Sequence, residues 1–235
     1  MKYDKKIKIL GFEQGSVAYL IETCLETELY NCFDIILNTD HYPEDPLIAL
    51  DDKMVSITHE TDYRFEEADK TPVHFGVLHA HIKYVLYHYF LNHHNINQSR
   101  YQSFVHPLAY FPESSSFENG IYIGQLTAVS SFCRFGFGVT IKKSCSIGHH
   151  SIFGDFVTIN PGAVVAGYTN IGEGTEIGTG ATVSNNITVG KQCLIGAGSV
   201  VTKDIPDGVI AYGNPCRVIR KNERWDKAHG IVSEF

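Results

Sequence analysis

Between residues 105 and 201 the chain repeats a hydrophobic position every six residues. Stepping by six from Val105 to Val201 meets an aliphatic or phenylalanine side chain each time, and from residue 127 onward the residue two places earlier is small or β-branched. A helix needs a period near 3.6 and a strand a period of 2, so this period fits neither. It is typical of a parallel β-helix, in which three faces of six residues close a coil of about 18 residues. We therefore predict a solenoid of about six coils, stacked at about 4.8 Å, with glycines such as Gly154 and Gly172 turning the corners.

The hydrophobic pattern before residue 100 is different. It predicts strands over 6–12, 32–38 and 73–78, and helices over 14–30 and 81–94. Strands that alternate with helices favour a small parallel α/β domain of Rossmann-like type over residues 1–100.

The six-residue phase is lost after Val201. We assign residues 101–212 to the solenoid domain and residues 213–235 to a C-terminal cap and tail. A cap is expected because an uncovered last coil would expose the unpaired edges of its strands.

Two adjacent histidines, His149 and His150, lie inside the repeat. With a coil of about 18 residues, Gly167 lies above His149 at the same corner, about 4.8 Å away. An imidazole can take a proton near neutral pH, and a backbone N–H can stabilise an oxyanion, which are the parts that acyl transfer needs. The spacing alone is also compatible with two ordinary exposed corner residues.

Composition narrows the function classes. The formal net charge is −7 and the 19 Lys and Arg are scattered, which disfavours a nucleic-acid partner or an anionic membrane surface. No apolar run reaches the roughly 18 residues that span a bilayer, so we expect a cytoplasmic protein without membrane insertion. The six cysteines form no CxxC pair, and His149 and His150 are the only histidines between residue 107 and Val201, so we expect neither disulfides nor a metal.

The segment "IGHHSIFGDFVTINPGAVVAG" (147–167) resembles the hexapeptide-repeat sugar acyltransferases, which include sialic acid O-acetyltransferases and bacterial nucleotide-aminosugar N-acetyltransferases. The resemblance covers nearly the whole chain. It implies a left-handed β-helix, acetyl-CoA as acyl donor, and a homotrimer with active sites between subunits. It aligns the general base with His149, and the amide that meets the acetyl carbonyl with Gly167.

The same resemblance assigns further binding residues. Thr179 and Ala197 match positions that line the acetyl-CoA groove, and Lys203 and Arg217 are either phosphate partners of the cofactor or solvated surface cations. On the acceptor side, Gly11 and Gly15 of "GFEQG" and Asp40 of "LNTD" are the nearest matches to residues that bind a nucleotide-sugar. From the residues alone, this turn could also be purely structural.

Three departures from the family pattern stand out. His150 replaces a carboxylate, and a neutral imidazole could orient His149 but cannot stabilise an imidazolium as a carboxylate does; Asp155 or Glu173 could substitute. Thr158 replaces a second histidine near the acetyl group. The first turn also lacks the usual run of glycines.

Together these features predict an acetyl-CoA-dependent enzyme that N-acetylates an amino sugar by direct transfer, with His149 as general base. The favoured acceptor is a nucleotide-linked 4-amino-4,6-dideoxy sugar for surface glycan synthesis. Two alternatives stay open: a sugar O-acetyltransferase of sialic-acid type, and a sugar-binding or scaffold homologue with little turnover. An acceptor hydroxyl in place of an amine would distinguish the first alternative from the predicted enzyme. Release of CoA would distinguish the predicted enzyme from the second alternative.

Overall fold

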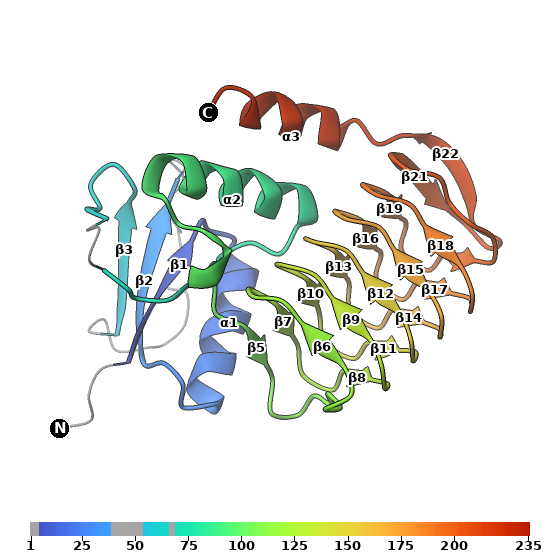
Figure 1. Cartoon of the computed structure of the whole chain (residues 1–235), viewed down its shortest axis with the longest axis horizontal. Helices are drawn as coiled ribbons and strands as arrows, with labels where there is room; N and C mark the ends of the chain where they lie inside the picture. The colour runs from blue at the N-terminus through green and yellow to red at the C-terminus, as the bar shows by residue number, and fades with distance from the viewer. Residues whose placement is uncertain (1–4, 39–53, 66–68) are drawn as a thin grey trace.

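The computed structural model describes residues 5–38, 54–65 and 69–235, and it shows an α/β unit at one end of a long solenoid (Figure 1). The sheet of the α/β unit is parallel, with strand order β3-β2-β1-β4. Its strands are β1 (Lys6–Leu10), β2 (Cys32–Leu37), β3 (Val55–His59) and β4 (Val73–Phe75). The predicted parallel sheet is confirmed. Edge strand β3 was missed, although Val55 and Ile57 alternate with polar residues as in a half-buried strand.

Two helices cover opposite faces of this sheet. Helix α1 (Gln14–Glu26) packs with Ile9 and its neighbours on one face, and α2 (Ala80–His94) packs with Leu10 and its neighbours on the other. This follows from the alternation of side chains along a strand. Helix α1 ends four residues earlier than predicted, because Glu28 adopts a left-handed backbone with φ of 52°. A short 3-10 helix, η1 (Gln98–Arg100), leads into the solenoid.

The solenoid has three faces of two-residue strands that pair in parallel with a register of 18 residues, as in Thr140 with Thr158. The face that we call the covered face contains β5 (Phe104–Val105), β7 (Tyr122–Ile123), β10 (Thr140–Ile141), β13 (Thr158–Ile159), β16 (Glu176–Ile177) and β19 (Leu194–Ile195). The open face contains β8 (Ala128–Val129), β11 (Ser146–Ile147), β14 (Val164–Val165), β17 (Thr182–Val183) and β20 (Val200–Val201). The third face contains β6 (Ser116–Phe117), β9 (Arg134–Phe135), β12 (Ile152–Phe153), β15 (Asn170–Ile171) and β18 (Thr188–Val189).

The inward side chains form one continuous core, as the six-residue period predicts. The corner glycines act differently from the prediction. Gly154 and Gly172 do not have a positive φ; a Cβ on either would come within 2.6 Å of the backbone of the coil above. Glycine is therefore needed there for the close approach of two coils, and the left-handed residue of each corner lies two places later, as at Phe156.

The α/β unit covers one face of the solenoid. The outward side chains of the covered face are at most 6% exposed from Phe104 to Glu176. From α2, buried Lys83 Nζ donates to Gly138 O at 2.6 Å and to Thr140 Oγ1 at 2.9 Å. The outward side chains of the open face are uncharged throughout, since they are alanine, serine, valine and threonine.

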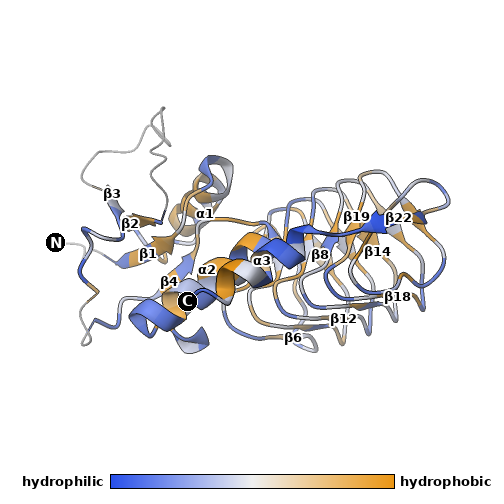
Figure 2. Ribbon diagram, turned by 90° about the horizontal axis from the view of Figure 1, so that it is seen from above, coloured by the Kyte–Doolittle hydropathy of each residue, from blue (hydrophilic) through white to orange (hydrophobic). Residues whose placement is uncertain are grey.

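The C-terminal segment covers the last coil and then turns back. Strand β21 (Val209–Tyr212) pairs with β19 and forms an antiparallel hairpin with β22 (Arg217–Lys221). Helix α3 (Arg224–Val232) then runs back towards α2, as Figures 1 and 2 show. Trp225, 4% exposed, packs against Tyr84 of α2 with ring centroids 5.4 Å apart, so the end of the chain ties the solenoid to the α/β unit.

Candidate active site

Three corners join the faces of the prism, and two of them carry candidate chemistry. The histidine corner, between the open and third faces, contains residues 148–151 and 166–169. The lysine corner, between the covered and open faces, contains residues 142–145 and 160–163. The remaining corner holds Asp155.

At the histidine corner the structure places Gly167 directly above His149. A Cβ on Gly167 would lie 3.1 Å from His149 Cε1 and 3.1 Å from Nε2, and the Tyr168 N–H donates to His149 O at 2.9 Å. Coil arithmetic predicts this juxtaposition, because corner residues 18 apart stack on one another. The exposed His149 ring therefore has one nitrogen beside the backbone of Gly167.

The Gly167 N–H is available to a ligand. Among residues 5–38, 54–65 and 69–235 it finds no hydrogen-bond acceptor. At the remaining corner, two of the equivalent amides have a carboxylate acceptor: Phe137 N–H donates to Asp155 Oδ1 at 3.0 Å, and Lys191 N–H donates to Asp207 Oδ1 at 2.8 Å. The Gly167 amide has no such acceptor among the described residues and can donate to a developing oxyanion.

His150 contacts His149 through a hydrogen bond of 3.0 Å between the two Nδ1 atoms. If His149 Nδ1–H donates and His150 Nδ1 accepts, the Nε2 of His149 is left unprotonated and can act as a base. The His150 backbone is left-handed, with φ of 57°, and its ring lies between two aromatic rings, stacked on Tyr168 (4.9 Å, 21°) and tilted against Phe132 (4.9 Å, 41°). These rings hold the orientation of the imidazole that supports His149.

The two carboxylates suggested as substitutes for the family's acid belong to the remaining corner. Asp155 accepts from Phe137 N–H, and Glu173 Oε2 lies 3.7 Å from Lys191 Nζ. Neither contacts His149 within one chain, whereas His150 does.

The residues predicted for the cofactor are spread over both corners. Lys203 lies on the histidine corner three coils above His149, about 14 Å away at the coil spacing. Thr179 and Ala197 are exposed on the lysine corner, and a Cβ on their neighbours Gly180 and Gly198 would meet no atom within 4 Å. Arg217 is exposed on β22, past the last coil.

Thr158 lies away from these corners. It is fully buried on the covered face, and its hydroxyl donates to Leu78 O at 2.8 Å. It therefore joins the solenoid to the α/β unit and cannot present its hydroxyl to an acetyl group at the histidine corner. Nothing in the sequence indicated the Thr158–Leu78 contact, because Leu78 lies 80 residues before Thr158.

The predicted acceptor turn is also engaged within the chain. The Gly11 N–H donates to Ile36 O at 2.8 Å, so it cannot serve a phosphate. Gly15 is exposed in the first turn of α1, and Asp40 lies outside the described residues.

Sequence reasoning missed a charged cluster at the start of α2. Glu176 of the covered face accepts from Ala80 N–H at 2.9 Å, and its carboxylate lies 3.5 Å from His79, which is 3.6 Å from Glu13. The contact with the Glu13 carboxylate, followed by that with Glu176, raises the pKa of His79 to about 9. The contact with His79 lowers the pKa of Glu13 to about 2, and although burial opposes it, the contacts of Glu176 with His79 and His81 lower its pKa as well.

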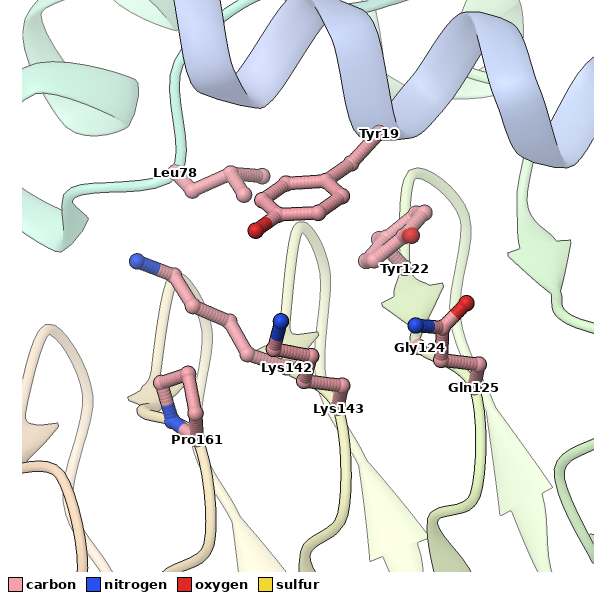
Figure 3. Close-up of a pocket in the computed structure, with 8 residues that line it drawn as sticks. All are labelled: Tyr19, Leu78, Tyr122, Gly124, Gln125, Lys142, Lys143 and Pro161. Carbon is pink, nitrogen blue, oxygen red and sulfur yellow. The ribbon is translucent and has the colours of Figure 1, made fainter.

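A pocket also escaped the sequence analysis. It lies between α1, the loop before α2, and the lysine corner (Figure 3). Its lining comprises Tyr19, Leu78, Tyr122, Gly124, Gln125, Lys142, Lys143 and Pro161. The one available signal was the pair of adjacent lysines at a corner position of the repeat.

Comparisons with known proteins bear on the fold. Residues 168–203 match the family model described as bacterial transferase hexapeptide (six repeats). No curated protein sequence matches the chain.

Among solved structures, the chain is similar to the acetyltransferase domain of PglB from Neisseria gonorrhoeae in complex with acetyl coenzyme A, with 23% identity and a TM-score of 0.76 over 92% of this chain and 100% of that one. It is similar to PerB from Caulobacter crescentus in complex with CoA and GDP-perosamine, with 19% identity and a TM-score of 0.72 over 92% and 98%. It is also similar to WeeI from Acinetobacter baumannii, with 20% identity and a TM-score of 0.74 over 91% and 99%. These likenesses confirm the predicted fold, a small α/β domain followed by a left-handed parallel β-helix.

Two properties of the described segments bear on membranes and on metals. None of their helices is long and apolar enough to cross a membrane. No group of three or more His, Cys, Asp or Glu side chains in these segments is arranged to hold a metal ion.

Proposed function

We propose that this chain, a hexapeptide-repeat protein with the fold of sugar acetyltransferases, is an acetyl-CoA-dependent acyltransferase that N-acetylates an amino sugar. The observation that carries the proposal is the histidine corner, where His149 lies against Gly167 and the Gly167 N–H has no acceptor among the described residues. The nucleotide-linked amino sugar of the PerB complex is the acceptor class that we carry over.

The geometry supports a direct transfer without a covalent enzyme intermediate. His149 Nε2 takes a proton from the acceptor amine as the nitrogen attacks the acetyl carbonyl carbon. The Gly167 N–H donates to the carbonyl oxygen as that oxygen gains negative charge. His150 accepts from His149 Nδ1–H throughout, and the protonated His149 returns its proton to the thiolate that leaves.

The lysine corner fits the extended arm of acetyl-CoA, which supplies the acetyl group as a thioester. At this corner the chain carries Thr179 and Gly180 in one coil and Ala197 and Gly198 in the next. The space beyond both glycines is open. A column of small residues leaves room for a flexible chain to lie along the edge of the prism. Lys203 and Arg217, both exposed near the last coils, are suited to its phosphates.

In one chain the two corners are separated by the open face, so a complete site needs a second copy. The open face is uncharged, and exposed Leu126, Phe132 and Tyr168 lie along its two edges. Apolar surface of this kind marks an interface. We propose a homotrimer with the three open faces turned inward, which brings the histidine corner of one copy beside the lysine corner of the next.

The test is thiol release from acetyl-CoA across a panel of nucleotide-linked amino sugars, free amino sugars and sialic-acid-like sugars. We expect release with an amine acceptor, and a loss of at least about a hundredfold in kcat for His149→Ala. The exposed His93→Ala on α2 is the matched control and should retain activity. Thiol release with a hydroxyl acceptor would replace the proposal with O-acetylation. If acetyl-CoA binds but no acceptor leads to thiol release, the chain is a binding protein.

A further inference from the structure

We infer that the pocket at the lysine corner binds the anionic group of the acceptor through Lys142 and Lys143, and that the first turn of the α/β unit does not bind it. This inference rests on the proposed function and names where its acceptor is held. The ligand chemistry is a phosphate or carboxylate attached to a sugar.

The walls of the pocket combine aromatic, apolar and cationic groups. Tyr19 from α1 and Tyr122 from β7 supply aromatic rings, and Leu78 and Pro161 supply apolar surface (Figure 3). Gln125 adds a hydrogen-bonding group at the rim. Concave, mostly apolar sites with a few polar groups are typical of small-molecule binding.

The positive charge in this pocket is uncompensated. Lys142 and Lys143 both line it, and within the described segments neither forms an ion pair with a carboxylate. Lys143 Nζ lies 5.6 Å from the centre of the Tyr19 ring, which keeps the ammonium at the pocket. Glu22, which faces Tyr122 from α1, pairs with neither lysine. Two neighbouring ammonium groups with no acidic partner attract an anion.

The first turn, where nucleotide phosphates bind in many α/β folds, carries the opposite charge. The Glu13 carboxylate lies at the start of α1, where it accepts from Ser16 Oγ and, at 3.4 Å, from Leu78 N–H. It also pairs with His79. A carboxylate at a helix N-terminus satisfies the positive end of the helix dipole and repels a second anion.

The position of the lysines relative to the base supports the assignment. Lys143 and His149 belong to the same coil, on either side of open-face strand β11. In a trimer with the open faces inward, Lys143 of one copy therefore lies at the height of His149 of the next copy. An acceptor anchored by its anion at the lysines extends its amine towards that histidine.

The test measures binding by calorimetry without acetyl-CoA, so it does not depend on turnover. The probes are uridine diphosphate, pyrophosphate, glucuronate and glucose, and the protein is the full chain at low ionic strength. We compare wild type with Lys142→Gln/Lys143→Gln and with Lys191→Gln, an exposed lysine at the equivalent corner position of another corner. We expect at least one anionic probe to bind the wild type, with a Kd at least about tenfold higher in the double variant and unchanged in Lys191→Gln.

The outcomes distinguish a phosphate from a carboxylate as the bound anion. They also test this inference separately from the proposed function. Lysine-dependent binding of the diphosphates indicates a phosphate, and lysine-dependent binding of glucuronate alone indicates a carboxylate. Equal binding of an anion to wild type and double variant, or binding of no anion, overturns the inference. Neither result bears on thiol release or on His149→Ala, which test the proposed function separately.

Discussion

At the scale of single residues, the unusual feature is a histidine in the place where relatives are expected to carry an acid beside the base. When His149 Nδ1–H is the donor of the 3.0 Å bond to His150 Nδ1, the Nε2 of His149 is left unprotonated, as a base needs. His150 keeps its left-handed backbone although the conformation costs a bulky residue of the order of 1 kcal/mol or more. Its stacking on Tyr168 and its contact with Phe132 compensate for that cost. We therefore propose His150 as a positioning residue that fixes a ring but adds no negative charge.

This role predicts opposite effects for two substitutions of His150. His150→Ala should lower kcat by about tenfold with little change in the KM of acetyl-CoA, because it frees the orientation of His149 but leaves the base in place. His150→Glu should keep kcat near or above the wild-type value. Its carboxylate should also move the acid limb of the kcat/KM profile about one pH unit upward, since a neighbouring negative charge favours the imidazolium. A pH profile that is identical in wild type and His150→Glu would exclude the orienting contact.

At the scale of elements, the start of α2 is held by the solenoid. The N-terminal amide of the helix at Ala80 donates to Glu176, whose carboxylate is buried on the covered face, and His79 bridges Glu176 to Glu13. This places a negative charge at the positive end of a helix of 15 residues. It also joins three elements that are far apart in sequence, namely α1, α2 and β16.

The raised pKa of His79 predicts a pH-dependent contribution to stability. With a folded pKa of about 9 against 6.5 for an ordinary histidine, its contribution is fully present below about pH 6.5 and is lost as the pH rises through 9. The lowered pKa of Glu13, about 2, gives a contribution that is present above about pH 4.5 and is lost as the pH falls towards 2. The contact is therefore strongest between these two limits, at about pH 4.5–6.5.

Thermal unfolding of wild type and His79→Asn between pH 6 and 10 tests this contribution. His79 is 39% exposed, so after discounting for solvent screening we expect a difference of about 1 kcal/mol near pH 6, or about 2–4 °C in Tm, that closes above pH 9. Buried Lys83, whose pKa burial lowers to about 7, also titrates in this range but is common to both proteins. A difference in Tm that is constant with pH would show that the imidazole is not charged in the folded state.

The same elements show what the sequence could and could not predict. The period of six predicted the solenoid, and the stacking of Gly167 over His149, because the inward positions and corners depend only on residues 6 and 18 places apart. The outward residues of the covered face gave no such signal. Thr158 and Glu176 take their roles from Leu78 and Ala80, which are 80 and 96 residues away. The pocket at Tyr19 likewise requires the docking of α1 against the solenoid, which no local pattern encodes.

At the scale of the whole molecule, the three faces of the prism have different roles. The α/β unit occupies the covered face, and α3 ties the far end of the solenoid back to that unit (Figure 2). The third face carries charged Arg134 and polar Asn170, so it is suited to solvent. Only the open face combines uncharged strands with apolar edges in the described part of the chain, and its two edges are the corners that carry Lys143 and His149.

This arrangement predicts that two impaired variants restore activity when mixed. His149→Ala lacks the base but keeps the lysines, and Lys142→Gln/Lys143→Gln lacks the anion site but keeps the base. If each site combines the histidine corner of one copy with the lysine corner of the next, random mixing at equal amounts restores about a quarter of the sites, because one pairing in four joins two intact corners. Thiol release, measured at limiting acceptor after co-refolding or co-expression of the two variants, checks this.

Matched controls make the result specific to shared sites. Mixing His149→Ala with His150→Ala should restore little beyond the activity of His150→Ala itself, because both changes lie on the same corner and never combine into an intact one. Val164→Lys on the open face places charges against one another across the proposed interface, and should yield monomers in size-exclusion chromatography with thiol release reduced at least about a hundredfold. Monomers that keep wild-type activity, or mixtures that stay inactive while trimers form, would show that each site lies within one chain, and would place the acceptor's anion away from the lysine corner that faces the neighbouring histidine.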